Sequence, residues 1–132
     1  MVEIVFPDDW SERLAWLSAM ATLVIGLAAM LFPQTIGHFL GLFVRSGSNN
    51  GLSELRSSFG GMWVGLGLAC IILAQPFTYF ALGLAFLGAL LGRLIAMVVD
   101  RSFNLHCLVA TVIVALGAYF PLRFALEVFG LV

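Results

Sequence analysis

The chain has 132 residues, of which 62% are hydrophobic and 10% are charged, and its mean hydropathy is +1.11. Soluble domains carry about 25% charged residues, so this chain lacks the polar side chains that would cover a surface facing water. Its formal net charge of −1 excludes the strong positive field on which nucleic-acid binding relies. The composition predicts an integral membrane protein of one domain.

The first apolar run, residues 14–32, is long enough to span a bilayer as a helix, and Pro33 marks its end. The residues before it are acidic and the run is long, which favours a retained transmembrane helix over a cleaved secretory signal. After the proline, Ile36, Phe39 and Leu40 recur at helical spacing. This pattern predicts a short helix lying in the membrane interface.

Three further spans follow, at about residues 52–75, 77–99 and 105–120. Pro76 stops the second span, and Pro121 either kinks or ends the fourth. Backbone hydrogen bonds must be satisfied internally in lipid, so apolar segments of this length are expected to be helices. The sequence therefore predicts an all-α, antiparallel four-helix bundle in one transmembrane domain, with spans two and three as a tight hairpin.

Both termini are then expected on one side of the membrane and the longer loops on the other. The arginines near the loop side are more numerous, namely Arg45, Arg56, Arg93 and Arg101 against Arg13 and Arg123. The positive-inside rule accordingly favours loops in the cytoplasm and termini outside.

Small residues recur every four positions in spans two and three. The first stripe is Ser57, Gly61, Gly65 and Ala69, and the second is Gly88, Gly92 and Ala96. Helices in lipid associate through close packing at small residues. The short link between the two spans favours stripes that face each other, and homodimerisation is the alternative use.

Ionisable residues near the loop side form a predicted polar cluster of Glu54, Arg56, Arg93 and Asp100. Antiparallel pairing of spans two and three places them in one layer. Glu54 shares a face with the small-residue stripe, whereas Arg56 points about 200° away from it and can reach the interface. We therefore expect an ion pair between Glu54 and Arg93, which would offset the cost of an arginine inside a span.

Three uses of this cluster are open. An ion pair that fixes the register of two helices is favoured. A pocket for an anionic headgroup, a small ligand or a proton is the second use, with Arg93 and Arg56 as hydrogen-bond donors. A contact surface for another membrane subunit is the third.

The sequence gives little support for a metal or haem site, a nucleotide-binding loop, a disulfide or a catalytic site. His38, His106 and Cys107 lack compact ligand spacing, so we expect no metal, haem or other cofactor. The glycine-rich run at 60–67 follows no strand, which excludes a nucleotide-binding loop. Cys70 and Cys107 are expected near opposite membrane faces, too far apart for a disulfide. With no catalytic spacing, the chain is expected not to be an enzyme.

Two short motifs carry a resemblance to a known family. Glu54, Arg56, Gly60 and Gly61 form E-x-R-x-x-x-G-G, and Gly92 with Arg93 precedes Asp100. In these motifs the chain resembles a family of small four-helix bacterial membrane proteins of unknown function. The resemblance implies a four-helix bundle in a bacterial cytoplasmic membrane and supplies no activity. The family often has glycine after the aspartate, where this chain has Arg101.

The function favoured by these features is a structural or accessory membrane component. It would associate through helix packing with itself or with a larger membrane complex, in the lipid bilayer of the cell membrane. The alternative is a carrier or receptor for a small anionic or lipid ligand at the intramembrane polar cluster.

Overall fold

The computed structural model describes residues 7–43, 49–101 and 103–132, and within these ranges it contains helices and no strand. In chain order they are α1 (Trp10–Leu31), α2 (Pro33–Phe39), α3 (Asn50–Glu54), the π-helix η1 (Leu55–Gly61), α4 (Met62–Leu73), α5 (Pro76–Val99) and α6 (Leu105–Val128). Helices α3, η1 and α4 follow one another without a break. Arg45, one of the arginines expected on the loop side, lies outside the described residues.

Among the described residues, four helical segments are long and apolar enough to cross a membrane: α1, the α3–η1–α4 segment, α5 and α6. The prediction of an all-α, multi-pass membrane protein is thereby confirmed, and α2 is the short helix expected after the first span. Pro33 and Pro76 each stand at the start of a helix, where the missing N–H leaves no helical hydrogen bond unmade. Pro121 does not end the fourth span, because α6 continues through it to Val128.

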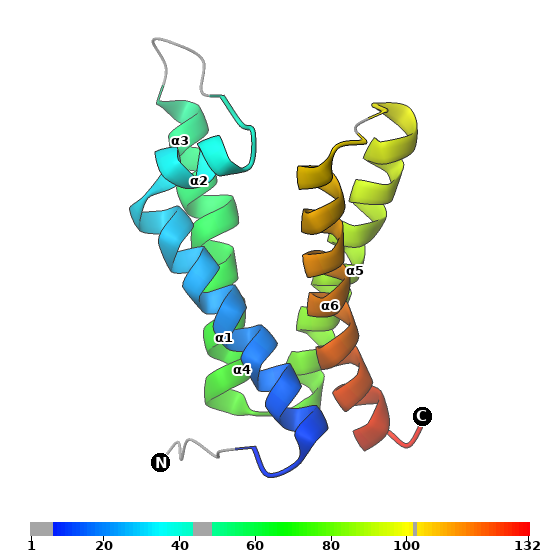
Figure 1. Cartoon of the computed structure of the whole chain (residues 1–132). Coiled ribbons are helices and arrows are strands. Elements are labelled where there is room, and N and C mark those ends of the chain that lie inside the picture. Colours follow the sequence, from blue (N-terminus) through cyan, green and yellow to red (C-terminus); the bar gives the residue numbers. More distant parts are fainter. Residues whose placement is uncertain (1–6, 44–48, 102) are drawn as a thin grey trace.

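The long helices form two pairs, as Figure 1 shows. The N-terminal pair consists of α1 packed along η1 and α4, and the C-terminal pair consists of α5 packed along α6. The pairs meet where α1 begins and α6 ends, which we call the terminal end. They diverge toward the loop end, which carries α2 and the turn between α5 and α6. This corrects the expected tight hairpin of spans two and three, since the short 74–75 link joins helices that then separate.

Backbone-to-backbone contact through glycine holds the N-terminal pair together. A Cβ atom added to Gly26 would lie 2.7 Å from the Val64 nitrogen, and one added to Gly60 would lie 2.8 Å from the Met30 nitrogen. Lower in the pair, a Cβ on Gly67 would lie 2.9 Å from a backbone nitrogen of α1. Only residues without a side chain permit this approach, which lets two helices gain dispersion contacts in a lipid solvent.

The C-terminal pair packs side chains into glycine notches instead. The Leu122 side chain fills the space above Gly83, and the Phe86 ring lies over Gly117. Near the terminal end, the ring of buried Tyr79 meets Phe124 edge to face, with 5.3 Å between ring centroids. Tyr79, Phe86 and Phe124 join buried side chains of α1 and α4 in one core, so the core sits where the two pairs meet.

Candidate functional site

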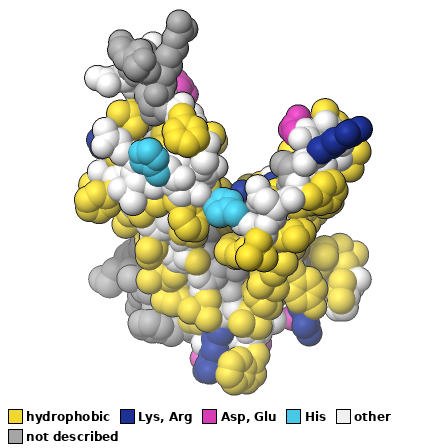
Figure 2. All heavy atoms as spheres, turned by 45° about the horizontal axis from the view of Figure 1, so that its top comes forward, with side chains coloured by type: hydrophobic (Ala, Val, Ile, Leu, Met, Phe, Trp, Pro, Cys, Tyr) yellow, Lys and Arg dark blue, Asp and Glu magenta, His cyan; other side chains and the backbone are white. Residues whose placement is uncertain are grey.

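A cavity of about 490 Å³ lies between the two pairs, lined mainly by α1 and α6 with contributions from α2, η1, α4 and α5. Figure 2 shows the pairs as two lobes separated by a notch at the loop end, with hydrophobic side chains over much of the surface in view. This volume falls within the range of about 300–1,000 Å³ found for small-ligand sites. The divergence of the two pairs thus creates a space large enough for a ligand.

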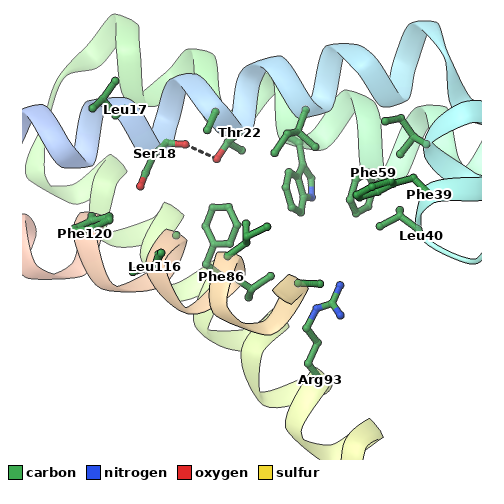
Figure 3. Close-up of a pocket in the computed structure, with 18 of the residues that line it drawn as sticks. Leu17, Ser18, Thr22, Phe39, Leu40, Phe59, Phe86, Arg93, Leu116 and Phe120 are labelled. Carbon is green, nitrogen blue, oxygen red and sulfur yellow. Dashed lines mark hydrogen bonds between the residues drawn. The ribbon is translucent and has the colours of Figure 1, made fainter. Parts of the chain in front are cut away.

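The cavity wall is almost entirely apolar. Most of the residues that line it are aliphatic or aromatic, among them Leu17, Ile25, Phe59, Trp63, Ile113 and Phe120. The Thr22 hydroxyl also faces the cavity, but it donates a hydrogen bond of 2.7 Å to the Ser18 carbonyl oxygen within α1 (Figure 3). This wall offers dispersion contacts along most of its length and few free polar groups.

Arg93 is the one charged side chain among the described residues that line the cavity. It is half-buried, and its guanidinium forms no hydrogen bond or ion pair with any described residue. Figure 3 shows it reaching from α5 toward the end of the cavity where Phe39 and Leu40 lie, while Leu17 and Phe120 lie at the opposite end. The cavity therefore has one cationic end and one apolar end.

The cavity is elongated along the helix axes. Its lining on α1 runs from Leu14 to Ile25, which is about 16 Å of helix at 1.5 Å per residue. Arg93 stands six residues before Val99, the last residue of α5, and so about 9 Å of helix inside the loop end. An unpaired guanidinium at this depth is costly, and residues of this kind in spans are typical of functional sites.

Two members of the predicted polar cluster have structural partners. The Arg56 guanidinium donates a 2.7 Å hydrogen bond from Nη1 to the Met30 carbonyl oxygen. That carbonyl belongs to the last turn of α1, where helix carbonyls lack helical partners and cations are favourable. Glu54 accepts a 3.2 Å hydrogen bond from the Ser58 hydroxyl, one turn along the same segment. Both side chains thus form hydrogen bonds within the N-terminal half of the fold.

The expected ion pair between Glu54 and Arg93 does not form in the described structure. Glu54 belongs to the N-terminal pair and Arg93 to the C-terminal pair, and the pairs diverge at this end. Asp100 is exposed, and its backbone N–H donates to the Ala96 carbonyl oxygen at the end of α5. The cluster is therefore dispersed over two helix pairs, and Arg93 is the member that faces the cavity.

The two small-residue stripes do not meet either. A Cβ atom added to Gly65, Gly88 or Gly92 would have no neighbour within 4 Å. The Ser57 hydroxyl turns back to its own segment and donates to the Ser53 carbonyl oxygen at 3.0 Å. Of the others, Gly61, Ala69 and Ala96 are half-buried. The intramolecular use of the stripes is thus corrected, because α4 and α5 separate after their short link; association with another helix stays a prediction.

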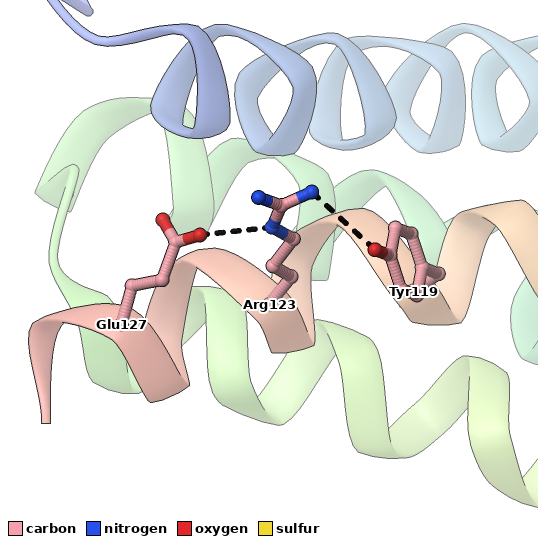
Figure 4. Close-up of polar contacts among 3 residues, drawn as sticks. All are labelled: Tyr119, Arg123 and Glu127. Carbon is pink, nitrogen blue, oxygen red and sulfur yellow. Dashed lines mark hydrogen bonds and ion pairs between the residues drawn. The ribbon is translucent and has the colours of Figure 1, made fainter. Parts of the chain in front are cut away.

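A polar group that the sequence analysis missed lies on α6 near the terminal end (Figure 4). Arg123 Nε and Glu127 Oε1 form an ion pair of 2.8 Å, and Arg123 Nη1 donates to the Tyr119 hydroxyl at 3.4 Å. All three lie on one helix face at spacings of four. That spacing was the available signal, and the expected end of the span near Pro121 concealed it. Arg123 and Glu127 thus pair with each other on α6, and Ser11 of α1 also lies within hydrogen-bonding reach of Glu127.

The histidines and cysteines form no metal site among the described residues, where no three His, Cys, Asp or Glu side chains lie together. Cys70 and Cys107 are both free thiols, as expected from their separation. The His106 ring meets Phe39 edge to face at 5.3 Å between centroids. This contact joins α2 to α6 and bridges the two pairs at the loop end.

Comparison of the chain with family models, with curated proteins and with solved structures found no match. The family resemblance of the Glu54 and Arg93 motifs accordingly stays a prediction.

Proposed function

We propose that this multi-pass membrane protein is a receptor or carrier for an anionic amphiphile held in the cavity between its helix pairs. The observation that carries the proposal is the Arg93 guanidinium, half-buried at one end of an apolar cavity and without a partner among the described residues. A charge out of water is costly unless it is paired. An anionic group of a ligand would supply the pair, and the apolar wall would take up the rest of the ligand.

The same geometry argues against the register clamp favoured by the sequence. A clamp requires a carboxylate within hydrogen-bonding reach of Arg93, and Glu54 instead accepts from Ser58. The N-terminal pair is held by its glycines and by the Arg56 cap. None of these contacts involves Arg93, which leaves that residue available for a ligand.

An accessory role through helix association is the second candidate. It is supported by Gly88 and Gly92, which are exposed on α5 with open space around them. Small residues on an outward helix face suit close packing against another span, of a second copy or of another subunit. We further propose the bacterial cytoplasmic membrane as the location, with termini outside, on the basis of the family resemblance and the arginine count.

The test is to purify the full chain from its membrane in a mild non-ionic detergent and to identify amphiphiles that remain bound, by native mass spectrometry and lipid extraction. We expect a bound anionic amphiphile with the unaltered chain and its loss in Arg93→Met. Arg101→Met is the matched control, because it removes an exposed arginine near the same end. Equal retention of anion by both variants would refute the role of Arg93, and co-purifying subunits without a bound amphiphile would favour the accessory role.

A further inference from the structure

We infer that the ligand is a single-chain carboxylate, a long-chain fatty acid with its carboxylate on Arg93 and its chain running between α1 and α6 toward Leu17 and Phe120. This inference rests on the proposed function and adds the class of ligand and its direction. Three features of the cavity carry it: its length, its side opening and its charge.

The length of the cavity matches one acyl chain. Its lining covers about 16 Å of α1, and one leaflet of the hydrocarbon core is about 15 Å deep. A phospholipid would need room for two chains side by side over that length. A volume of about 490 Å³ lies in the range of sites that hold a single small ligand.

The side opening gives such a chain a route from the bilayer. Leu17, Ile113 and Leu116 line the cavity, yet each is about half exposed. The cavity is therefore open along the gap between α1 and α6, in the part of the molecule that faces lipid hydrocarbon. A chain can enter sideways without leaving an apolar medium. At the loop end, the contact between Phe39 and His106 narrows the entrance to the cavity.

The charge of the cavity selects the headgroup of the ligand and sets the direction in which the ligand lies. One arginine and no carboxylate line it among the described residues, so one negative charge on the ligand balances the site. A guanidinium binds a carboxylate through two parallel hydrogen bonds. Arg93 lies nearer the loop end than Leu17 and Phe120 do, which suits a polar head toward the loop end and an apolar tail toward the terminal end.

Trp63 lines the cavity, so its fluorescence can report whether a ligand is bound there. The full chain is placed in phosphatidylcholine nanodiscs and titrated with dibrominated stearate, whose bromines quench tryptophan fluorescence on contact. Trp63→Phe measures the contribution of the other tryptophans. We expect saturable quenching by the acid, binding about tenfold weaker for its methyl ester, and a comparable loss for the acid with Arg93→Met. Arg93→Lys should recover part of the affinity, and Arg101→Met should bind as the unaltered chain does.

The direction is tested by photocrosslinking. A stearate with a diazirine at its methyl end should label peptides that contain Leu17 or Phe120, whereas one with the diazirine beside the carboxylate should label peptides that contain Phe39 or Leu40. Labelling in the reverse order overturns the assigned direction.

The outcomes separate the inference from the proposed function. If butyrate or lysophosphatidate competes as well as stearate, and Arg93→Met abolishes the competition, the fatty-acid assignment is wrong and anion binding at Arg93 stands. If the methyl ester binds as tightly as the acid, Arg93 does not read the headgroup and both fail. Absence of saturable quenching by dibrominated stearate overturns the fatty-acid assignment, and if no anionic amphiphile is retained by the purified chain either, both fail.

Discussion

The two helix pairs are held together by different means. In the N-terminal pair, Gly26, Gly60 and Gly67 bring helix backbones into direct contact. In the C-terminal pair, Gly83 and Gly117 instead receive the side chains of Leu122 and Phe86. Burial from water contributes little to helix association inside lipid, so contact geometry decides how firmly each pair is held. The first arrangement tolerates no added atom, whereas the second can adjust at Gly117, where only ring atoms of Phe86 lie close.

The arginines show the same contrast between the pairs. Arg56 of the N-terminal pair caps α1 through the Met30 carbonyl oxygen, so its charge is used within the fold. Arg93 of the C-terminal pair faces the cavity without a partner among the described residues. Under the proposed function, a ligand would supply the partner that Arg93 lacks. The difference between the two arginines can be tested separately from binding.

The largest effect is expected from Gly26→Ala, which places a methyl group against the Val64 nitrogen and the Gly60 carbonyl oxygen. Backbone atoms cannot rotate away, so the two helices must separate. We expect a loss of about 2–3 kcal/mol in the free energy of unfolding, measured by equilibrium denaturation in mixed micelles. Gly65→Ala is the matched control: its Cβ meets nothing within 4 Å, and it should be neutral or slightly stabilising. Equal losses would contradict the backbone packing.

A smaller effect is expected from Gly117→Ala in the C-terminal pair. The added methyl group would lie 3.0 Å from two ring atoms of Phe86, and the ring can shift toward the cavity. We expect a loss of about 1 kcal/mol, partly recovered when Phe86→Leu is added. Gly88→Ala on α5, where the space is open, serves as the control. A loss as large as that of Gly26→Ala would show that the two pairs do not differ in tolerance.

The paired variants Arg56→Met and Arg93→Met test the contrast between the arginines. The first removes the cap of α1 and should lower the free energy of unfolding by about 1 kcal/mol. The second removes an unpaired charge from apolar surroundings, so we expect unchanged or slightly higher stability in the absence of ligand. Thermal unfolding in detergent stripped of lipid measures both. A substantial loss with Arg93→Met would restore the register clamp.

Much of this fold could be predicted from hydropathy and proline positions alone. The four spans and the short helix after Pro33 follow from apolar length and from helix starts at proline. The pairing of helices could not be predicted, because the 74–75 link is short whether α4 and α5 stay together or separate. Long-range packing decides between those arrangements, and the sequence shows it only as scattered glycines.

The candidate site was predicted in part. The π-helix η1 explains much of why the faces predicted for span two differ from those in the structure. Faces in span two were assigned with about 3.6 residues per turn, but Leu55–Gly61 forms a π-helix with wider turns. Residues on either side of it therefore do not share the face that a spacing of four implies. Gly60 and Gly67, seven residues apart, turned out to face α1. Arg93 was identified from its charge in an apolar run, which does not depend on helix periodicity.

The smallest effects concern the two turns where non-glycine residues take the left-handed conformation. Ala74, which ends α4, has φ of 46°, and Arg101, which follows α5, has φ of 51°. A side chain in this conformation costs roughly 1–2 kcal/mol, and the greater freedom of glycine in the unfolded chain cancels part of the gain. Ala74→Gly and Arg101→Gly should each stabilise by about 0.5 kcal/mol, measured as small rises in the thermal midpoint.

Ala81→Gly on the exposed face of α5 is the control for these turn variants, and its effect should have the opposite sign, a loss of about 0.5–1 kcal/mol. The two turns should also differ in their effect on fatty-acid affinity. Ala74 links the helix pairs, so a more permissive residue there eases any change in their divergence and should alter fatty-acid affinity measured through Trp63. Arg101 lies within the C-terminal pair, and Arg101→Gly should leave that affinity unchanged. Equal changes in affinity would show that the divergence of the pairs is not set at the 74–75 link.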